Sequence, residues 1–177
     1  MQIFIETERL FLRELMPSDK NGMFELDADT EVHRYLGNHP VQNIKEAEEA
    51  IAFIRQQYTD NGIGRWAIIE KATGDFVGWG GFKLVTSVIN NHSNYHDIGY
   101  RFIKRYWGKG YATESARAVV DYGFQQLKLQ EIYAFADAGN KESRHVLEKI
   151  GLSFVEKFSY EGVAHDWFQL TKANWIK

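Results

Sequence analysis

The segment DIGYRFIKRYWGKGYATESA, residues 97–116, constrains the fold more than any other part of the chain. Its first part, DIGYRFI, has the apolar and aromatic residues typical of a β-strand. Glycines follow at positions 108 and 110. From Ala112 onward, apolar residues recur every three to four positions, which is the period of a helix. A strand that turns into a helix through two glycines predicts a mixed α/β domain.

This strand-to-helix junction has the features of an anion-binding site. Gly108 and Gly110 permit backbone conformations that a side chain would forbid, so several N–H groups can point into one concavity. The start of the helix adds unpaired N–H groups and the positive end of the helix dipole. Arg105 and Lys109 add positive charge at the rim. We therefore expect the segment from Arg105 to Gly110 to bind a diphosphate; a plain glycine turn is the alternative.

Two other phosphate-binding motifs do not fit the junction. A Walker A loop requires Ser or Thr directly after its Gly-Lys, whereas Lys109 is followed by Gly110. A dinucleotide fingerprint requires Gly or Ala three residues after its second glycine, and Thr113 stands at that position. A nucleotide-binding protein of either kind is therefore disfavoured.

Composition excludes several classes of protein. The 177 residues suit one domain, and a net charge of −3 gives no general attraction to nucleic acid or anionic lipid. The absence of cysteine removes disulfides, thiolate nucleophiles and cysteine-bound metals. The opening MQIFIETERL does not resemble a secretion leader, and no apolar run reaches the roughly 18 residues of a membrane span. We expect a cytoplasmic protein with no nucleic-acid or membrane partner.

Hydrophobic periodicity predicts seven strands and four helices. IFIETERLFLREL is predicted as a single strand, and helices are predicted after Pro17, over 45–58, from Ala112 and over 141–150. SVINNHSNYH is predicted as a long connection. The remaining strands are RWAIIE, FVGWGGFKLV, DIGYRFI, EIYAFAD, FVEKFSY and HDWFQLT, the last two joined as a hairpin at Glu161-Gly162.

Motifs along the chain resemble, in order, those of one enzyme superfamily. RYWGKGYATE resembles the R/Q-x-x-G-x-G/A coenzyme A loop of the GNAT N-acetyltransferases, and the likeness is greatest to the RimJ/RimL branch. TERLFLREL followed by SD resembles that branch's first strand and helix, GWGGF its third strand and DIGYRF its fourth. NKESRHVLEKIGLSF and GVAHDWFQLT resemble its last helical segment and final hairpin. The resemblance covers nearly the whole chain, so residues 1–177 are expected to form one N-acetyltransferase domain.

The resemblance implies an α/β (α+β) GNAT fold, with a mixed, mostly antiparallel sheet of about seven strands and about four flanking helices. The fourth and fifth strands would splay apart, and acetyl-coenzyme A would bind there with its pantetheine arm along the fourth strand. A main-chain N–H of that strand would also stabilise the oxyanion. The residues expected to bind the cofactor are Phe102, Ile103, Arg105, Trp107, Gly108, Lys109, Gly110, Tyr111, Ala112, Asn140 and Ser143.

Three side chains are candidates for proton transfer. Ser143 corresponds to a serine proposed in some relatives to protonate the departing thiolate, whereas the tyrosine that many GNAT enzymes place four residues later is Leu147 in this chain. His96 and Asp97 are the candidate bases, since histidine titrates near neutrality and the family often has an acid at this strand start. The alternatives are a helix-surface serine and a polar strand end facing solvent. Asn140 can also serve as a helix cap.

The resemblance implies transfer of the acetyl group of acetyl-coenzyme A to a primary amine, either a protein N-terminus or a small molecule, by direct attack in a ternary complex. A catalytically silent acyl-coenzyme A-binding or regulatory module is the alternative, because the usual tyrosine is missing. No metal is expected, since the six histidines are scattered along the chain. Relatives are often dimers, so a homodimer is an open alternative to a monomer.

Overall fold

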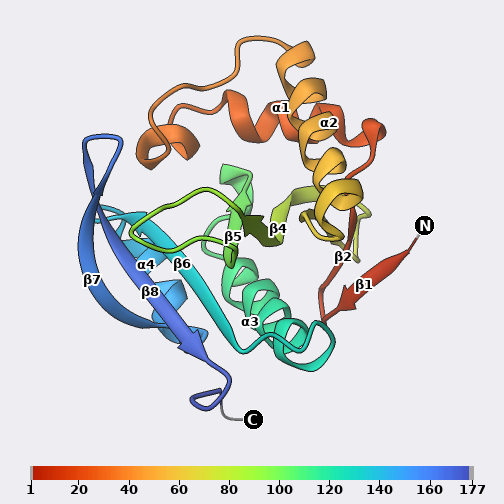
Figure 1. Cartoon of the computed structure of the whole chain (residues 1–177). Coiled ribbons are helices and arrows are strands. Elements are labelled where there is room, and N and C mark those ends of the chain that lie inside the picture. Colours follow the sequence, from red (N-terminus) through yellow and green to blue (C-terminus); the bar gives the residue numbers. More distant parts are fainter. Residues whose placement is uncertain (1, 176–177) are drawn as a thin grey trace.

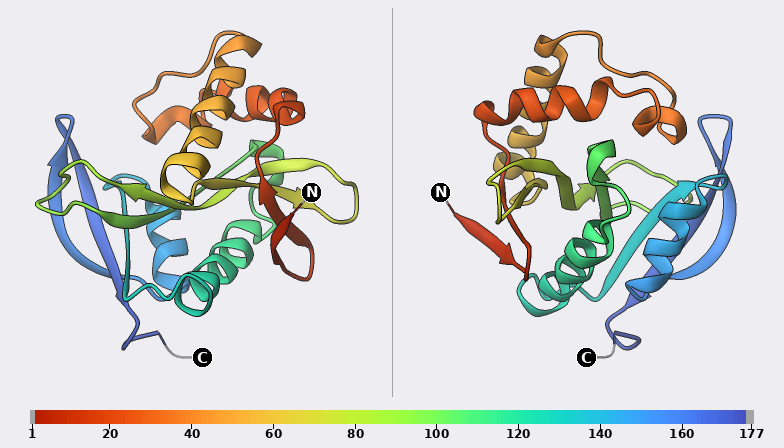
Figure 2. Two further views of the ribbon diagram at one scale, coloured as in Figure 1. Left: turned by 45° about the vertical axis from the view of Figure 1, so that its right-hand side comes forward. Right: turned by 180° about the vertical axis from the view of Figure 1, so that it is seen from behind.

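The fold is built on one sheet of eight strands, as described by a computed structural model that covers residues 2–175. The strand order is β1-β2-β3-β4-β5-β6-β8-β7. Among the described strands, β5 and β6 are the only parallel neighbours, and all other pairs are antiparallel. Helices α1 and α2 lie on one face of the sheet, called the front face below, and α3 and α4 lie on the back face (Figures 1 and 2).

The sheet and its flanking helices have the following bounds. The strands are β1 (Ile3–Glu6), β2 (Leu10–Glu14), β3 (Arg65–Glu70), β4 (Phe76–Val85), β5 (Tyr95–Phe102), β6 (Glu131–Asp137), β7 (Ser153–Tyr160) and β8 (Val163–Thr171). The helices are α1 (Lys20–Ala28), α2 (Ile44–Asn61), α3 (Tyr111–Gln125) and α4 (Lys141–Lys149). Single 3-10 turns are η1 (Pro17–Asp19), η2 (Val32–Tyr35) and η3 (Lys104–Tyr106). The predicted mixed sheet with four helices is confirmed.

The opening segment departs from the prediction of one strand. The chain reverses after β1 because Thr7 bonds Leu10 twice: its N–H donates to the Leu10 carbonyl at 2.9 Å, and its Oγ1 accepts the Leu10 N–H at 3.1 Å. β1 and β2 are therefore an antiparallel hairpin. The prediction of a single strand over IFIETERLFLREL is wrong, and the sheet has eight strands instead of about seven.

The back-face helix α3 packs closely on β4 and β5. Its buried side includes Ala116, Val119 and Phe124. The packing depends on Gly123, since a Cβ at that position would lie 2.7 Å from the ring of Phe82 on β4. The close fit fixes α3 against the sheet and so fixes where its N-terminus points.

Strands β5 and β6 separate after a single pair, Asp97 with Tyr133. Beyond that pair β5 continues toward η3 and α3 beside β4, and β6 continues toward α4 beside β8. This confirms the splay predicted between the fourth and fifth strands of the sequence-based scheme, which are β5 and β6. We call the space between them the opening. Within residues 2–175, no helix combines the length and the apolar character needed to cross a membrane.

Candidate active site

The N-terminus of α3 presents main-chain N–H groups without helical acceptors. The first bond of the helix runs from the Glu114 N–H to the Gly110 carbonyl at 3.0 Å, so the N–H groups of residues 111–113 have no acceptor inside α3. Gly110 is the N-cap at φ 81° and contributes no capping side chain, and Gly108 also has a positive φ of 74°. We call this turn, residues 108–113, the cradle. Its N–H groups and the helix dipole favour an anion.

The cradle has room for an anion. A Cβ built on Gly108 would meet no heavy atom within 4 Å. A Cβ on Gly110 would meet the guanidinium of Arg9 at 3.5 Å. Open space, free N–H groups and an adjacent cation together fit the pyrophosphate of coenzyme A.

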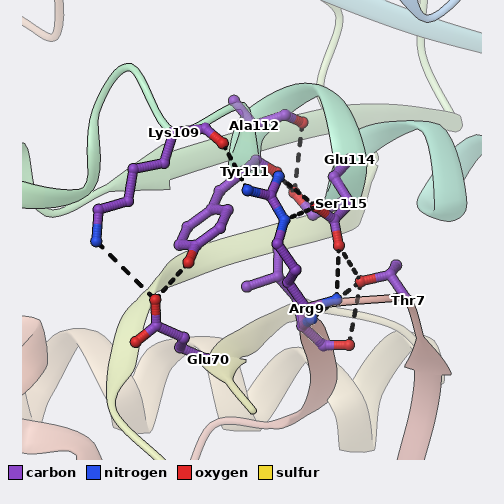
Figure 3. Close-up of polar contacts among 9 residues, drawn as sticks. Thr7, Arg9, Glu70, Lys109, Tyr111, Ala112, Glu114 and Ser115 are labelled. Atoms are coloured by element: carbon purple, nitrogen blue, oxygen red, sulfur yellow. Dashed lines mark hydrogen bonds and ion pairs between the residues drawn. The ribbon is translucent and has the colours of Figure 1, made fainter. Parts of the chain in front are cut away.

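Arg9 reaches the cradle from the turn between β1 and β2. Its Nη1 donates to the Lys109 carbonyl at 2.9 Å and its Nε donates to Glu114 at 2.7 Å (Figure 3). The Thr7 hydroxyl donates to the same carboxylate at 2.7 Å. Burial would raise the pKa of Glu114, but the hydrogen bonds from Thr7 and Arg9 outweigh burial and lower it. Sequence reasoning did not single out Arg9, although it lies in the TERLFLREL motif.

The two cations predicted to bind the phosphates, Arg105 and Lys109, each lie close to a carboxylate of the protein. Arg105 lies against α1, where its Nε and Nη2 donate to the two carboxylate oxygens of Glu25 at 2.7 and 3.0 Å. These hydrogen bonds raise the pKa of Arg105. The Lys109 ammonium lies 4.0 Å from Glu70 and 4.7 Å from the centre of the Tyr106 ring, and Figure 3 shows its side chain directed toward Glu70.

Strand β5 offers main-chain groups to the opening. The Ile103 N–H donates to the Val77 carbonyl on β4 at 3.0 Å, and the Ile103 carbonyl accepts an N–H from η3, so both groups of Ile103 are engaged within the protein. Because successive strand residues direct their main-chain groups to opposite edges, those of Phe102 and Tyr100 face the opening. The Phe102 carbonyl accepts the indole N–H of Trp107 at 2.8 Å. Of the two residues predicted to pair with pantetheine, the Phe102 N–H is therefore the group directed there.

The N-terminus of α4 lies on the other side of the opening. Asn140 is its N-cap, since Oδ1 accepts the Ser143 N–H at 3.1 Å, which confirms the capping role. The Tyr100 hydroxyl of β5 donates to the Ser143 carbonyl at 3.1 Å and lies 3.4 Å from the Ser143 Oγ. Leu147, at the position where many relatives carry tyrosine, is a buried core residue.

His96 and Asp97 lie on opposite faces of the sheet. Asp97 is buried on the front face and forms an ion pair with Arg65 of β3. Burial raises the pKa of Asp97, and the guanidinium of Arg65 opposes that rise. The His96 ring is half-buried on the back face, edge-on to Phe82 at 6.2 Å, and burial lowers its pKa. The two candidate bases are not brought together, and the alternative of a solvent-facing strand end is wrong for Asp97, which is buried, whereas His96 is half-buried.

A chain of polar contacts shares the front face with Asp97. Arg101 of β5 bonds Asp27 of α1 at 2.6 Å, and His33 lies 3.3 Å from the same carboxylate oxygen. The guanidinium groups of Arg65 and Arg101 lie 5.6 and 4.9 Å from the Trp79 ring. These residues come from β3, β4, β5, α1 and η2, which are separate segments of the sequence, so no local motif could predict this chain of contacts.

Comparison with known proteins identifies the family. Residues 9–153 match the family model of the acetyltransferase (GNAT) domain. An uncharacterized N-acetyltransferase of Bacillus licheniformis, p20, is 30% identical over 161 residues, which cover 91% of this chain and 85% of that protein. The spermidine N(1)-acetyltransferase of Escherichia coli K12 is 28% identical over 159 residues, covering 89% and 77%. The solved structure of the ribosomal L7/L12 α-N-protein acetyltransferase RimL with coenzyme A superposes with a TM-score of 0.80 at 15% identity, covering 96% and 98%.

The chain belongs to the GNAT acetyltransferases, and its fold is RimL-like. It is an acetyl-coenzyme A-dependent N-acetyltransferase.

Proposed function

We propose that this enzyme acetylates a primary amine, either a protein N-terminus or a small molecule, by direct attack of the amine on bound acetyl-coenzyme A. The observation that carries the proposal is the cradle at the start of α3, which follows directly from the strand that borders the opening. The pyrophosphate binds the N–H groups of residues 108–113, with Arg9 and Arg105 beside it. The pantetheine arm then runs along β5 past Phe102 toward Asn140 and Ser143.

The layout of the opening supports a ternary complex. The cofactor groups come from the ends of β5, α3 and α4, whereas Asp97 lies on the front face of the sheet, paired with Arg65. The two substrates therefore have separate approaches to one point, and the amine can attack the thioester without an acetylated enzyme. The chain contains no cysteine that could carry the acetyl group.

The proposed proton transfers use one group on each side of the opening. Asp97 is proposed as the base because it lies on the front face at the last pair between β5 and β6, whereas His96 faces the back. A terminal α-amine, with a reference pKa of about 8, needs less help than a lysine at about 10.4. Ser143 is proposed to protonate the departing sulfur.

Charge on the front face favours acceptors other than polyamines. Lys83 lies opposite Asp97 in the β4–β5 register, so it shares the face with Arg65 and Arg101. These three cations face two carboxylates, Asp27 and Asp97. A polycation would add repulsion at this position, so we expect a peptide N-terminus to react faster than spermidine.

An acceptor panel tests the proposal. Labelled acetyl-coenzyme A is incubated with peptides, amino acids, aminoglycosides and spermidine, and initial rates are measured while both substrates are varied. Intersecting double-reciprocal lines are expected for a ternary complex, and parallel lines would contradict it. Binding of coenzyme A without turnover of any amine would instead favour the silent acyl-coenzyme A-binding module.

Three further properties are proposals that the same protein sample can test. The chain forms one N-acetyltransferase domain, which predicts a single cooperative unfolding transition. The transfer needs no metal, so activity should survive chelation. Sedimentation equilibrium distinguishes a homodimer from a monomer.

A further inference from the structure

A hydroxyl pair bridges the opening between β5 and α4. The Tyr100 hydroxyl donates to the Ser143 carbonyl at 3.1 Å and lies 3.4 Å from the Ser143 Oγ. Tyr100 projects from the strand that borders one side of the opening, and Ser143 lies in the first turn of the helix on the other side. The pair joins two elements that are 43 residues apart in sequence.

The position of Tyr100 places this pair where the two strands have separated. The last contact between β5 and β6 is Asp97 with Tyr133, and Tyr100 lies three residues further along β5, about 10 Å at the usual strand rise. The main-chain groups of Tyr100 face the opening, as do those of Phe102 two residues later. The contact with Ser143 therefore borders the path proposed for pantetheine.

The phenol of Tyr100 is a stable hydrogen-bond donor. Burial raises its pKa to about 12, although its hydrogen bond to Ser143 opposes the rise. Tyr100 therefore stays protonated at every working pH, and its proton is directed to the Ser143 carbonyl.

We propose that Tyr100 is a positioning residue that holds the Ser143 hydroxyl toward the leaving sulfur of acetyl-coenzyme A. The inference rests on the proposed function of Ser143 as proton donor. During transfer the amine nitrogen bonds the acetyl carbon and the carbon–sulfur bond breaks. Sulfur takes the Ser143 proton, the proton that the amine loses passes to Asp97, and Ser143 is then reprotonated from solvent while Tyr100 keeps its own.

The thiol pKa of bound coenzyme A tests the proposal without any acceptor. The thiolate is followed by ultraviolet difference absorbance as pH is raised, in the wild type, Tyr100→Phe and Ser143→Ala. A Ser143 hydroxyl held toward sulfur stabilises the thiolate, so the acid dissociation constant should fall about five- to tenfold in both variants. Tyr122→Phe is the control, because it removes a half-buried hydroxyl from α3, beside Trp66. It should leave the thiol pKa unchanged.

Kinetics provide the second readout. With an accepted amine, Tyr100→Phe should lower kcat about five- to tenfold while KM for acetyl-coenzyme A stays within about twofold. The double variant with Ser143→Ala should be no slower than Ser143→Ala alone, because Tyr100 is proposed to act on the sulfur only through the Ser143 hydroxyl.

Two results would overturn the role of Tyr100: an unchanged thiol pKa in Tyr100→Phe, or multiplicative losses in the double variant. The thiol measurement needs only coenzyme A binding. It therefore distinguishes failure of this inference from failure to find any amine that the enzyme acetylates.

Discussion

The cradle and the front face offer two different kinds of polar group. At the start of α3 the available groups are main-chain N–H groups of residues 108–113, fixed by the backbone itself. On the front face the groups are side chains already paired with one another, such as Arg65 with Asp97 and Arg101 with Asp27. The first arrangement, if it binds the diphosphate as proposed, depends on backbone geometry more than on side-chain identity. The second can be altered by single substitutions, which suits the part of an enzyme that selects among amines.

Breaking the front-face pair should have the largest effect. Asp97→Asn leaves the buried Arg65 without its carboxylate, so the free energy of unfolding should fall by about 3–5 kcal/mol in urea denaturation. Glu48→Gln is the matched control, because it breaks an ion pair of 2.7 Å with Lys20 that is exposed. That loss should be about 1 kcal/mol or less. Equal losses in the two variants would show that burial of the Asp97 pair does not matter.

A negative charge placed in the cradle should strongly weaken the binding of coenzyme A. Gly110→Asp puts a carboxylate beside the uncapped N–H groups and strains a position at φ 81°, so affinity for coenzyme A should fall about 100-fold, or about 2.7 kcal/mol, by calorimetry. Gly162→Asp is the control. It introduces the same side chain at φ 79° with no heavy atom within 4 Å, in the turn between β7 and β8. Survival of affinity in Gly110→Asp would rule out the cradle as the pyrophosphate site.

Removing the Glu25 carboxylate that pairs with Arg105 should strengthen the binding of coenzyme A. Glu25→Gln removes the carboxylate that shares the Arg105 guanidinium, so affinity for coenzyme A should rise about two- to fivefold at low salt, in keeping with an exposed pair. Glu31→Gln frees the neighbouring Lys104 instead and should leave affinity unchanged. A decrease in Glu25→Gln would mean that Arg105 acts only as a link to α1.

Substitution of His96 should have the smallest effect, which appears as a pH dependence of the free energy of unfolding. Burial lowers its pKa, so below the ordinary value of about 6.5 the unfolded chain binds the extra proton first. The stability contributed by neutral His96 is therefore complete above that pH and is lost as pH falls toward its folded pKa. The difference in unfolding free energy between wild type and His96→Gln should grow with pH across this window and then level off. A difference that does not change with pH would mean that the His96 ring is exposed to solvent.

The contrast between the two regions also explains what the sequence could predict. The cradle depends on consecutive residues, so the glycines and the helix start were sufficient to locate it. The splay of β5 and β6 followed from family resemblance. Arg9 was missed because it meets Glu114 across 105 residues, and the partner of Asp97 was missed because Arg65 lies 32 residues away.

The direction of side chains was the second property that could not be predicted from the sequence. Sequence neighbours His96 and Asp97 suggested one site, yet a strand sends them to opposite faces. The turn at Thr7 was missed for a related reason, since TERL contains neither Gly nor Pro, and the reversal depends on the Thr7 side chain.

Backbone amide NMR during a titration with coenzyme A tests the central claim most directly. The N–H signals of residues 108–113 should shift on addition of coenzyme A and stay in place with pantetheine, which lacks the pyrophosphate. Arg9 Nε should shift with them because it lies beside the cradle. Shifts confined to other parts of the chain, with the cradle signals unchanged at saturation, would contradict the assignment.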